Sequence, residues 1–330
     1  MRRNAAIIVM GLATTCAASV LAQGRGNQAA PYVAPAFDTY TPNIPGVVAA
    51  GTRVELITDA INGTEGPVVI PDGSLVFTEG GARRLTRIDA AGALSPFLEN
   101  IQSSGLGFDQ QGRMIANNNA DGKQGIYVVY PKGAEVTLVD RKTPGFEGAN
   151  DLVVDKKGGV YFTQPNAGNV GYVSPGGKGT SIVADTITRP NGIMLSPDER
   201  VLYVNDSRGE YILAFDVRPD GSLDNRRNFA RYDQLNPNSE FGDTGPGLQF
   251  RVTSCADGLA IDSEGRLYNA GCNGIQVYSP QGRHLGTIPT GRVINNLAFA
   301  GQDKKLLYLV GRGAAWKIRM IAQGYKGRAK

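Results

Sequence analysis

The sequence predicts an all-β fold, a six-bladed β-propeller whose ring is closed by an N-terminal strand in the last blade. Three observations support this prediction. Turn-forming residues are abundant, with 44 Gly and 18 Pro among 330 residues, which favours many short strands joined by turns. One sequence pattern recurs six times along the chain. Each copy has room for four strands, which is the usual content of a propeller blade.

The repeated pattern is a polar residue, a short apolar run, a turn that contains Asp or Gly, and a second apolar run. The polar residues that begin the six copies, here called the opening residues, are Glu65, Ser104, Asn150, Asn191, Asp257 and Asn295. In four copies a glycine follows eight residues later, at Gly73, Gly112, Gly158 and Gly265. The spacings are 39, 46, 41, 66 and 38 residues. A β-sandwich, the alternative fold, would not require this constant register.

The third copy shows the four strands best, at 152–154, 160–163, 170–174 and 180–184, between Gly, Asn and Pro turns. The last copy supplies only three strands by Met320, whereas a β-rich segment at 53–58 precedes the first copy. We expect this segment to complete the last blade. The predicted propeller spans 52–320, between an N-terminal extension at 23–51 and a C-terminal tail at 321–330.

The first 22 residues have the features of a secretory signal peptide. Arg2 and Arg3 precede an apolar run, and small residues lead to an expected cleavage between Ala22 and Gln23. A membrane anchor, the alternative, needs about 20 strongly apolar residues, and Gly, Thr and Ser interrupt this run. We therefore expect a periplasmic or secreted protein with no membrane attachment after cleavage.

Two of the three cysteines remain after that cleavage. Cys255 and Cys272 each lie seven residues from an expected hairpin turn at 262–265. A cross-strand disulfide is therefore geometrically plausible, and an oxidising compartment permits it. Two buried free thiols are the alternative.

Composition excludes several kinds of chemistry. The formal net charge is +4, from 34 Lys and Arg against 30 Asp and Glu, so we expect no nucleic-acid partner. The single histidine, His284, excludes two-histidine mechanisms and is interpreted as a surface residue. Three cysteines and one histidine also exclude Cys/His zinc modules. Any catalysis or metal binding must therefore rely mainly on carboxylates and other oxygen ligands.

We also expect the protein to be a monomer.

The opening residues are candidates for such a site. In a propeller the first strand of each blade lies nearest the central channel, so its first residues meet at one mouth of that channel. Five of the six opening residues carry a carboxylate or amide oxygen, and such hard donors suit Ca²⁺ or Mg²⁺. A single Asn or Asp is commonly a turn residue, but repetition at one register favours a shared cation site.

Five motifs extend this interpretation: EGP at Glu65, ND at Asn150, RPNG at 189–192, DGLAID at Asp257 and NNLAFAG at Asn295. Over 52–320 the chain resembles the SMP-30/gluconolactonase/LRE family, and especially its bacterial gluconolactonases. The resemblance implies a six-bladed propeller with one divalent cation that hydrolyses sugar lactones or related esters. The cation is usually Ca²⁺, with Zn²⁺, Mg²⁺ and Mn²⁺ as alternatives. The implied metal ligands are Glu65, Asn150, Asn191 and Asp257.

Substrate contacts are expected on the same face. Asn118 and Gln164 end second strands there and are candidates for hydrogen bonds to sugar hydroxyls, as is Asn150. Glu147 lies where animal members of the family carry an Arg before the channel Asn, in a region that shapes the substrate pocket. Gln164 is also a departure, because gluconolactonases commonly have Asp there. The insertion at 232–253 is either a lid or a surface excursion.

The expected mechanism uses the cation to polarise a lactone carbonyl and a carboxylate to take a proton from water. Asp257 is the first candidate for this base and Asp206 the second, and a turn aspartate is the alternative interpretation of Asp206. Three function classes remain open. They are a lactonase acting on a small lactone or ester, a related calcium-dependent esterase or phosphotriesterase, and a non-catalytic binding propeller with a structural metal.

Overall fold

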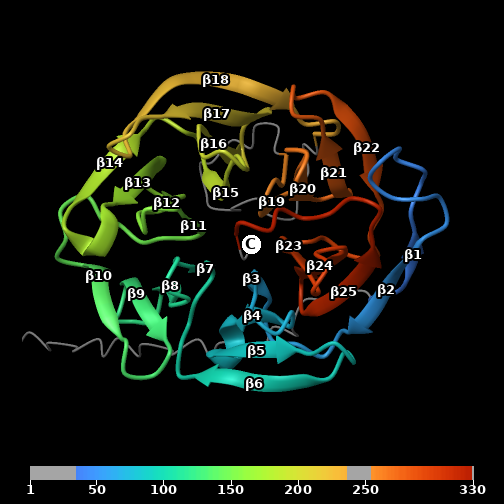
Figure 1. Cartoon of the computed structure of the whole chain (residues 1–330), viewed down its shortest axis with the longest axis horizontal. Helices are drawn as coiled ribbons and strands as arrows, with labels where there is room; N and C mark the ends of the chain where they lie inside the picture. The colour runs from blue at the N-terminus through green and yellow to red at the C-terminus, as the bar shows by residue number, and fades with distance from the viewer. Residues whose placement is uncertain (1–34, 236–253, 329–330) are drawn as a thin grey trace, which may run out of the picture. The chain divides into compact units, whose positions relative to one another are not determined.

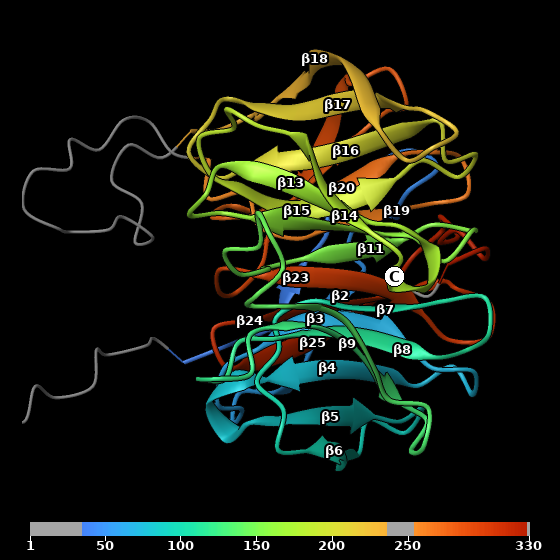
Figure 2. The ribbon, with the colours of Figure 1, turned by 90° about the vertical axis from the view of Figure 1, so that its left-hand side faces the viewer.

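The computed structural model describes residues 35–235 and 254–328. Within these residues the strands form six antiparallel sheets arranged in a ring around a central axis (Figure 1). The predicted six-bladed propeller is therefore confirmed, and the sandwich is excluded. Figure 2 shows the ring edge-on, with the strands running between its two faces. The predicted signal peptide at 1–22 lies outside the described residues.

The first three blades each contain four strands in chain order, with the first strand innermost. Blade 1 contains β3 (Glu65–Val69), β4 (Leu75–Glu79), β5 (Arg84–Ile88) and β6 (Leu94–Glu99). Blade 2 contains β7 (Leu106–Phe108), β8 (Met114–Asn118), β9 (Gly125–Tyr130) and β10 (Val136–Asp140). Blade 3 contains β11 (Leu152–Val154), β12 (Val160–Gln164), β13 (Asn169–Val173) and β14 (Thr180–Ala184).

The other three blades complete the ring. Blade 4 contains β15 (Pro190–Leu195), β16 (Val201–Asp206), β17 (Tyr211–Val217) and β18 (Leu223–Arg231). Blade 5 contains β19 (Leu259–Ile261), β20 (Leu267–Gly271), β21 (Gly274–Tyr278) and β22 (His284–Ile288). Blade 6 contains β23 (Asn296–Ala300), β24 (Leu306–Gly311), β25 (Ala314–Arg319), β2 (Arg53–Thr58) and β1 (Thr39–Tyr40). Two short 3₁₀ turns are η1 (Gly80–Ala82) and η2 (Pro175–Gly177).

Ring closure follows the prediction and adds one strand to it. β2 pairs antiparallel with β25, with Val54 opposite Ile318, so residues from both ends of the propeller share blade 6. β1 then pairs with β2 through Thr39 opposite Val54. This fifth strand was not expected, because two residues carry no detectable β pattern. Among the described residues no helix has the length and apolarity to cross a membrane.

Apolar side chains from neighbouring sheets fill the space between the blades. Tyr268 of blade 5 and Phe299 of blade 6 pack edge to face with ring centroids 5.0 Å apart. Aromatic pairs favour this geometry because a positive ring edge meets a negative ring face. Several of the largest fully buried side chains come from different blades: Trp316, Tyr161, Tyr268, Phe77 and Phe162. The blades are thus held together mainly by burial of apolar surface.

The glycine that lies eight residues after the opening residue is required by the backbone conformation of the turn. Gly73, Gly112, Gly158 and Gly265 all have positive φ, between 73° and 86°. Each lies in the tight turn between the first and second strands, where a left-handed residue closes the turn and glycine adopts that conformation without a Cβ clash. The fourth copy has Glu199 instead, also left-handed with φ 61°. A non-glycine residue in this conformation costs about 1 kcal/mol, so a compensating contact is expected.

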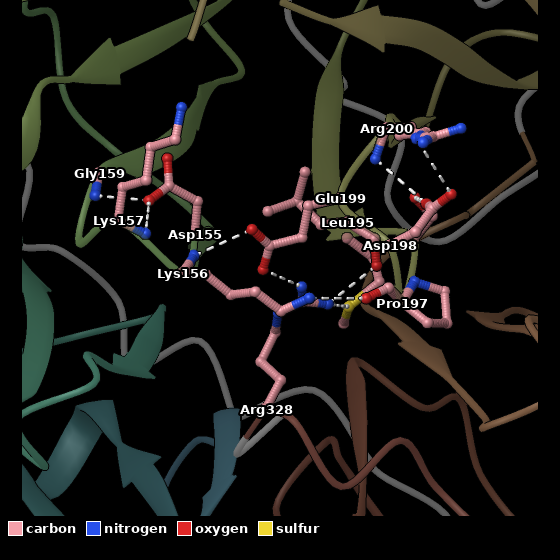
Figure 3. A network of polar contacts seen from close by, with 12 residues as sticks. Asp155, Lys156, Lys157, Gly159, Leu195, Pro197, Asp198, Glu199, Arg200 and Arg328 are labelled. Carbon is pink, nitrogen blue, oxygen red and sulfur yellow. Dashed lines mark hydrogen bonds and ion pairs between the residues drawn. The ribbon is translucent and has the colours of Figure 1, made fainter. Parts of the chain in front are cut away.

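Glu199 makes that contact with the C-terminal tail (Figure 3). Its Oε1 accepts a hydrogen bond from Arg328 Nη2 at 2.8 Å, and its Oε2 accepts one from the Lys156 backbone N–H at 3.0 Å. Arg328 Nη1 also donates to Leu195 O at 2.9 Å. The Arg328 side chain is only 5 % exposed. One carboxylate therefore connects blade 3, blade 4 and the tail.

The tail crosses the face of the ring opposite to the opening residues, here called the far face, and runs toward the centre of the ring (Figure 1). Ala322 N donates to Val47 O in the N-terminal extension at 3.1 Å, and Gly324 N donates to Lys304 O in blade 6 at 2.8 Å. Tyr325 N donates to Ile261 O in blade 5 at 3.3 Å. With the Arg328 contacts, the tail is a clasp that joins the last four blades.

Cys255 and Cys272 form a disulfide with their Cα atoms 5.4 Å apart, which confirms the predicted pairing and excludes free thiols. In a hairpin symmetric about 262–265, Leu259 would pair with Tyr268. In the structure it pairs with Asn269, so the ladder between β19 and β20 is offset by one residue. A β-bulge corrects this offset. Ala270 N donates to Gly258 O, and Ala270 O accepts from Asp257 N. The cysteines are brought opposite each other beyond this bulge.

Removing the disulfide is expected to destabilise the fold. In the chain-entropy model a bridge that closes a 17-residue separation contributes about 3 kcal/mol. The double variant C255A/C272A should therefore lose about 3 kcal/mol of unfolding free energy in urea titrations. Reducing agent should weaken the wild type by a similar amount and leave the variant unchanged. A loss below about 1 kcal/mol would contradict this account.

The clasp gives a second stability prediction. R328A leaves Glu199 without its buried cationic partner, so unfolding free energy should fall by about 3 kcal/mol. The matched control is R200A, on the same turn, because the Arg200 side chain is 86 % exposed and pairs with Asp198 at 3.8 Å. This exposed pair should contribute less than about 1 kcal/mol. Equal, small losses in both variants would show that the clasp does not stabilise the ring.

Candidate active site

All six opening residues lie on one face of the ring, here called the mouth face, because each inner strand begins there. In blades 3, 5 and 6 the opening residue donates its backbone N–H to the second strand, and the next residue faces the same partner. In blades 1 and 4 the ladder also shifts by one residue at this point. A β-bulge therefore begins these five inner strands. Bulges re-aim side chains and are common beside active sites.

A second feature fixes the backbone of three opening residues. A buried polar side chain on the second strand of one blade donates to the carbonyl of the opening residue of the next blade. Thr163 Oγ1 donates to Asn191 O at 2.7 Å, and Asn205 Nδ2 donates to Asp257 O at 2.6 Å. Asn117 Nδ2 lies 3.3 Å from Asn150 O. Here these three side chains are called the bridging residues. Their bridging role was not recognised in the sequence, although they recur 13 or 14 residues after the opening residues of their own blades.

Two acids from different blades interact across the mouth. Glu65 begins blade 1, and Asp257, which is only 6 % exposed, precedes blade 5. Blade 6 contacts both acids: Asn295 Nδ2 donates to Asp257 Oδ2 at 3.1 Å, and Asn296 Nδ2 donates to Glu65 Oε2 at 3.3 Å. Asn295 was recognised as an opening residue, whereas Asn296 was not. The only sign of Asn296 in the sequence is that it is polar at a position, directly after the opening residue, where most copies have glycine.

The surroundings of both acids oppose their ionisation. Burial raises the pKa of Glu65 well above its usual value, and the negative charges of Asp257 and Asp151 raise it further. Burial and the charge of Asp151 raise the pKa of Asp257 to about 7, although its hydrogen bond from Asn295 opposes the rise. Both carboxyl groups therefore resist ionisation when no cation is near. A divalent cation bound between them would reverse this effect.

The donor set fits a hard cation. Within 35–235 and 254–328 no three or more Asp, Glu, His or Cys side chains are grouped as a metal site, so amide oxygens must supplement the two carboxylates. Asn191 Oδ1 is buried and has no hydrogen-bond partner among the described residues. A buried polar oxygen without a partner is costly, and a cation would satisfy it. Two carboxylates with amide oxygens suit Ca²⁺.

Asp206, the second candidate base, has a different environment. Its Oδ1 accepts the backbone N–H of Arg189 at 2.9 Å, and its Oδ2 accepts that of Thr188 at 3.1 Å. Both oxygens therefore anchor the loop that leads into β15. These contacts favour the structural alternative for Asp206 over a role in proton transfer.

Gln164 is similarly engaged in holding a loop. Its Oε1 accepts the backbone N–H of Glu147 at 2.6 Å, and its Nε2 donates to Gly145 O at 2.9 Å and to Asn169 Oδ1 at 2.8 Å. The loop that it holds carries Glu147, which is exposed. Glu147 lines a pocket of about 230 Å³ on the mouth face, together with Gln124, Arg141, Phe146 and Gly148. Gln164 thus shapes this pocket through the loop.

The other two predicted substrate contacts, Asn118 and Asn150, are partly buried near the mouth face. Asn118 ends β8, is partly buried, and accepts the backbone N–H of Ala120 through Oδ1 at 3.0 Å. Asn150 is partly buried, and its backbone carbonyl accepts a hydrogen bond from Ser104 Oγ at 2.7 Å.

Two other regions named in the sequence analysis are the insertion and the histidine. Most of the insertion at 232–253, a candidate lid, lies outside the described residues, beyond position 235. His284 is partly exposed near Asp233, with Nδ1 3.4 Å from a carboxylate oxygen.

Comparisons with known proteins agree with this architecture. The gluconolactonase of Zymomonas mobilis subsp. mobilis is 26 % identical over 96 % of this chain and 95 % of its own length. Two lactonohydrolases of Aspergillus oryzae match over about half of their own length or less. The structure of a gluconolactonase from Xanthomonas campestris has a TM-score of 0.70 and 26 % identity, covering 87 % of this chain and 99 % of that one.

A more distant structure shares the fold. A calcium-binding protein, regucalcin, from Agrobacterium tumefaciens has a TM-score of 0.65 at 16 % identity, over 83 % of this chain and 95 % of that one. The sequence profile of the SMP-30/gluconolactonase/LRE-like region matches residues 63–311, which includes all six opening residues. The chain therefore belongs to the SMP-30/gluconolactonase/LRE-like family.

Proposed function

We propose that this protein is a divalent-cation-dependent hydrolase that opens sugar lactones. The observation that carries the proposal is that consecutive amides of blade 6 contact Glu65 and Asp257 at the channel mouth, where Asn191 Oδ1 is also buried without a partner. The gluconolactonases to which the chain is similar support the lactone as substrate. Residues Glu65, Asn150, Asn191 and Asp257 would hold the cation. The calcium-binding protein of the same fold supports Ca²⁺ as the ion.

In the proposed hydrolysis, the residues of the site have separate roles. When bound, the cation would act as a Lewis acid on the lactone carbonyl and stabilise the developing oxyanion. Asp257 is the proposed general base, because a bound cation would lower its pKa from about 7 and keep the carboxylate ionised, ready to accept a proton. Asn295 holds Oδ2 of this carboxylate, so we assign proton uptake from the attacking water to Oδ1. Glu147 and Arg141 line the pocket at the loop that leads to Asn150, where they would orient the substrate.

We also propose export through the signal peptide to the periplasm or the medium, with the protein acting there as a monomer. The disulfide supports this location, because such bonds persist in oxidising compartments and are rare in the cytosol. The proposed small-molecule substrate is consistent with a pocket of about 230 Å³ at the loop that leads to Asn150.

Chelation provides the first functional test. With D-glucono-1,5-lactone as substrate and pH-stat titration as the readout, EDTA should abolish hydrolysis above the spontaneous rate, and excess Ca²⁺ should restore it. Zn²⁺, Mg²⁺ and Mn²⁺ should be added separately to identify the effective ion. Phenyl acetate and a phosphotriester are the comparison substrates that separate the remaining hydrolase classes. Full activity after exhaustive chelation would exclude the proposed cation dependence.

Substitution of the proposed base provides the second test. D257N should lower kcat by at least about 100-fold, which is the lower range for loss of a general base. Calorimetric titration with Ca²⁺ shows whether the variant still binds the ion, so that a lost base is distinguished from a lost ligand. D206N is the comparison, with an expected loss of stability and a change in kcat below about tenfold. A larger loss of kcat in D206N than in D257N would reverse the assignment.

A further inference from the structure

The position after each opening residue is constrained by the neighbouring blade. At Gly105, for example, an added Cβ would lie only 2.8 Å from Asn150 O, a distance that real Cβ atoms do not tolerate. Asp151 and Asn296 depart from this rule, and both are only 1 % exposed. The other four copies have glycine here, at Gly66, Gly105, Gly192 and Gly258. Polar side chains at just two of the six positions indicate a specific role.

The two exceptions differ in charge and in contacts. Asn296 is neutral and donates to Glu65 Oε2, while its Oδ1 accepts the backbone N–H of Leu297 at 2.9 Å. Asp151 Oδ1 accepts the backbone N–H of Leu152 at 2.8 Å. Its Oδ2 lies 3.4 Å from the Ile193 backbone nitrogen, a long hydrogen bond into blade 4. The Asp151 carboxylate therefore lies between blades 3 and 4, which carry two of the proposed ligands.

Asp151 lies beside two of the proposed ligands, because it directly follows Asn150 and its Oδ2 contacts the backbone two residues after Asn191. Its negative charge raises the pKa of Glu65 and that of Asp257. Asp151 is thus a third carboxylate near the two acids, and it comes from a third blade. Arg189 and Arg312 partly offset this charge at Asp257, because each lowers its pKa. An excess of negative charge in a buried site is favourable only when a cation is bound.

We propose that Asp151 is a positioning residue of the cation site, which strengthens cation binding through its charge without acting as a ligand or a catalytic residue. This inference rests on the proposed cation dependence. Carboxylates behind a ligand shell commonly change metal affinity by 10- to 100-fold. A purely structural aspartate would instead stabilise the protein equally with and without the ion.

The variant D151N tests this proposal, because it removes the charge and keeps an oxygen that can accept a backbone N–H. Its matched control is D155N, at the other end of β11. Asp155 is also buried, and its Oδ1 accepts the backbone N–H groups of Lys157 and Gly159, each at 2.8 Å. The same change of charge is thereby made far from the mouth. Calcium affinity is measured by calorimetry, and the unfolding midpoint is measured in EDTA and in Ca²⁺.

The two variants should behave differently. D151N should weaken Ca²⁺ binding by at least about tenfold, while its midpoint in EDTA equals or exceeds that of the wild type, because a repulsive charge is gone. D155N should bind Ca²⁺ as the wild type does and unfold earlier in both conditions. If D151N binds Ca²⁺ within twofold of a calcium-binding wild type, this inference is overturned and the proposed function stands. A wild type that binds no divalent cation overturns both.

A trivalent ion gives a second readout. Because a charge effect scales with the charge of the ion, D151N should weaken Tb³⁺ binding by a larger factor than Ca²⁺ binding. D151E, which keeps the charge, should preserve the ratio of the two affinities. If D151N does not fold, D151S replaces it as the neutral variant. Equal factors for Tb³⁺ and Ca²⁺ in a folded neutral variant would refute a role through charge.

Discussion

The structure depends on how the carbonyl groups of the opening residues are satisfied. The bulge that begins most inner strands disrupts the regular ladder at this point, and a buried carbonyl without a donor would be costly. Thr163 and Asn205 donate to the carbonyls of Asn191 and Asp257 in the next blade. The position of each of these opening residues is therefore set jointly by two neighbouring blades. The mouth of the channel is a property of the closed ring, which no single blade could form alone.

Much of this arrangement could be predicted from the sequence, because the repeat fixes the register. The closing strand and the disulfide follow from the same register and are confirmed. Side-chain partners could not be predicted in this way. Gln164 ends a second strand at the mouth, as expected for a substrate contact, yet its amide is bound to the loop that carries Glu147. The strand end places this residue, but only the tertiary structure determines which groups lie within its reach.

Departures from glycine are more informative than the glycines themselves. Glu199 replaces a turn glycine and holds Arg328 of the tail. Asp151 and Asn296 replace glycines beside the channel and contact or influence the acids at the mouth. In all three cases a position that favours glycine for steric reasons carries a polar side chain that connects separate parts of the ring. The repeat alone could identify these exceptions, whereas their partners belong to other blades and have no fixed sequence spacing.

Blade 6 has a special position in this ring because it lies between the two principal acids. Asp257 precedes blade 5 and Glu65 begins blade 1, and blade 6 contacts them through the consecutive residues Asn295 and Asn296. Consecutive residues of a regular strand point to opposite faces of the sheet. Here the bulge at the start of β23 allows both amides to reach the mouth. Blade 6 is also the blade that β2 completes, so closure of the ring and the separation of the two carboxylates depend on the same sheet.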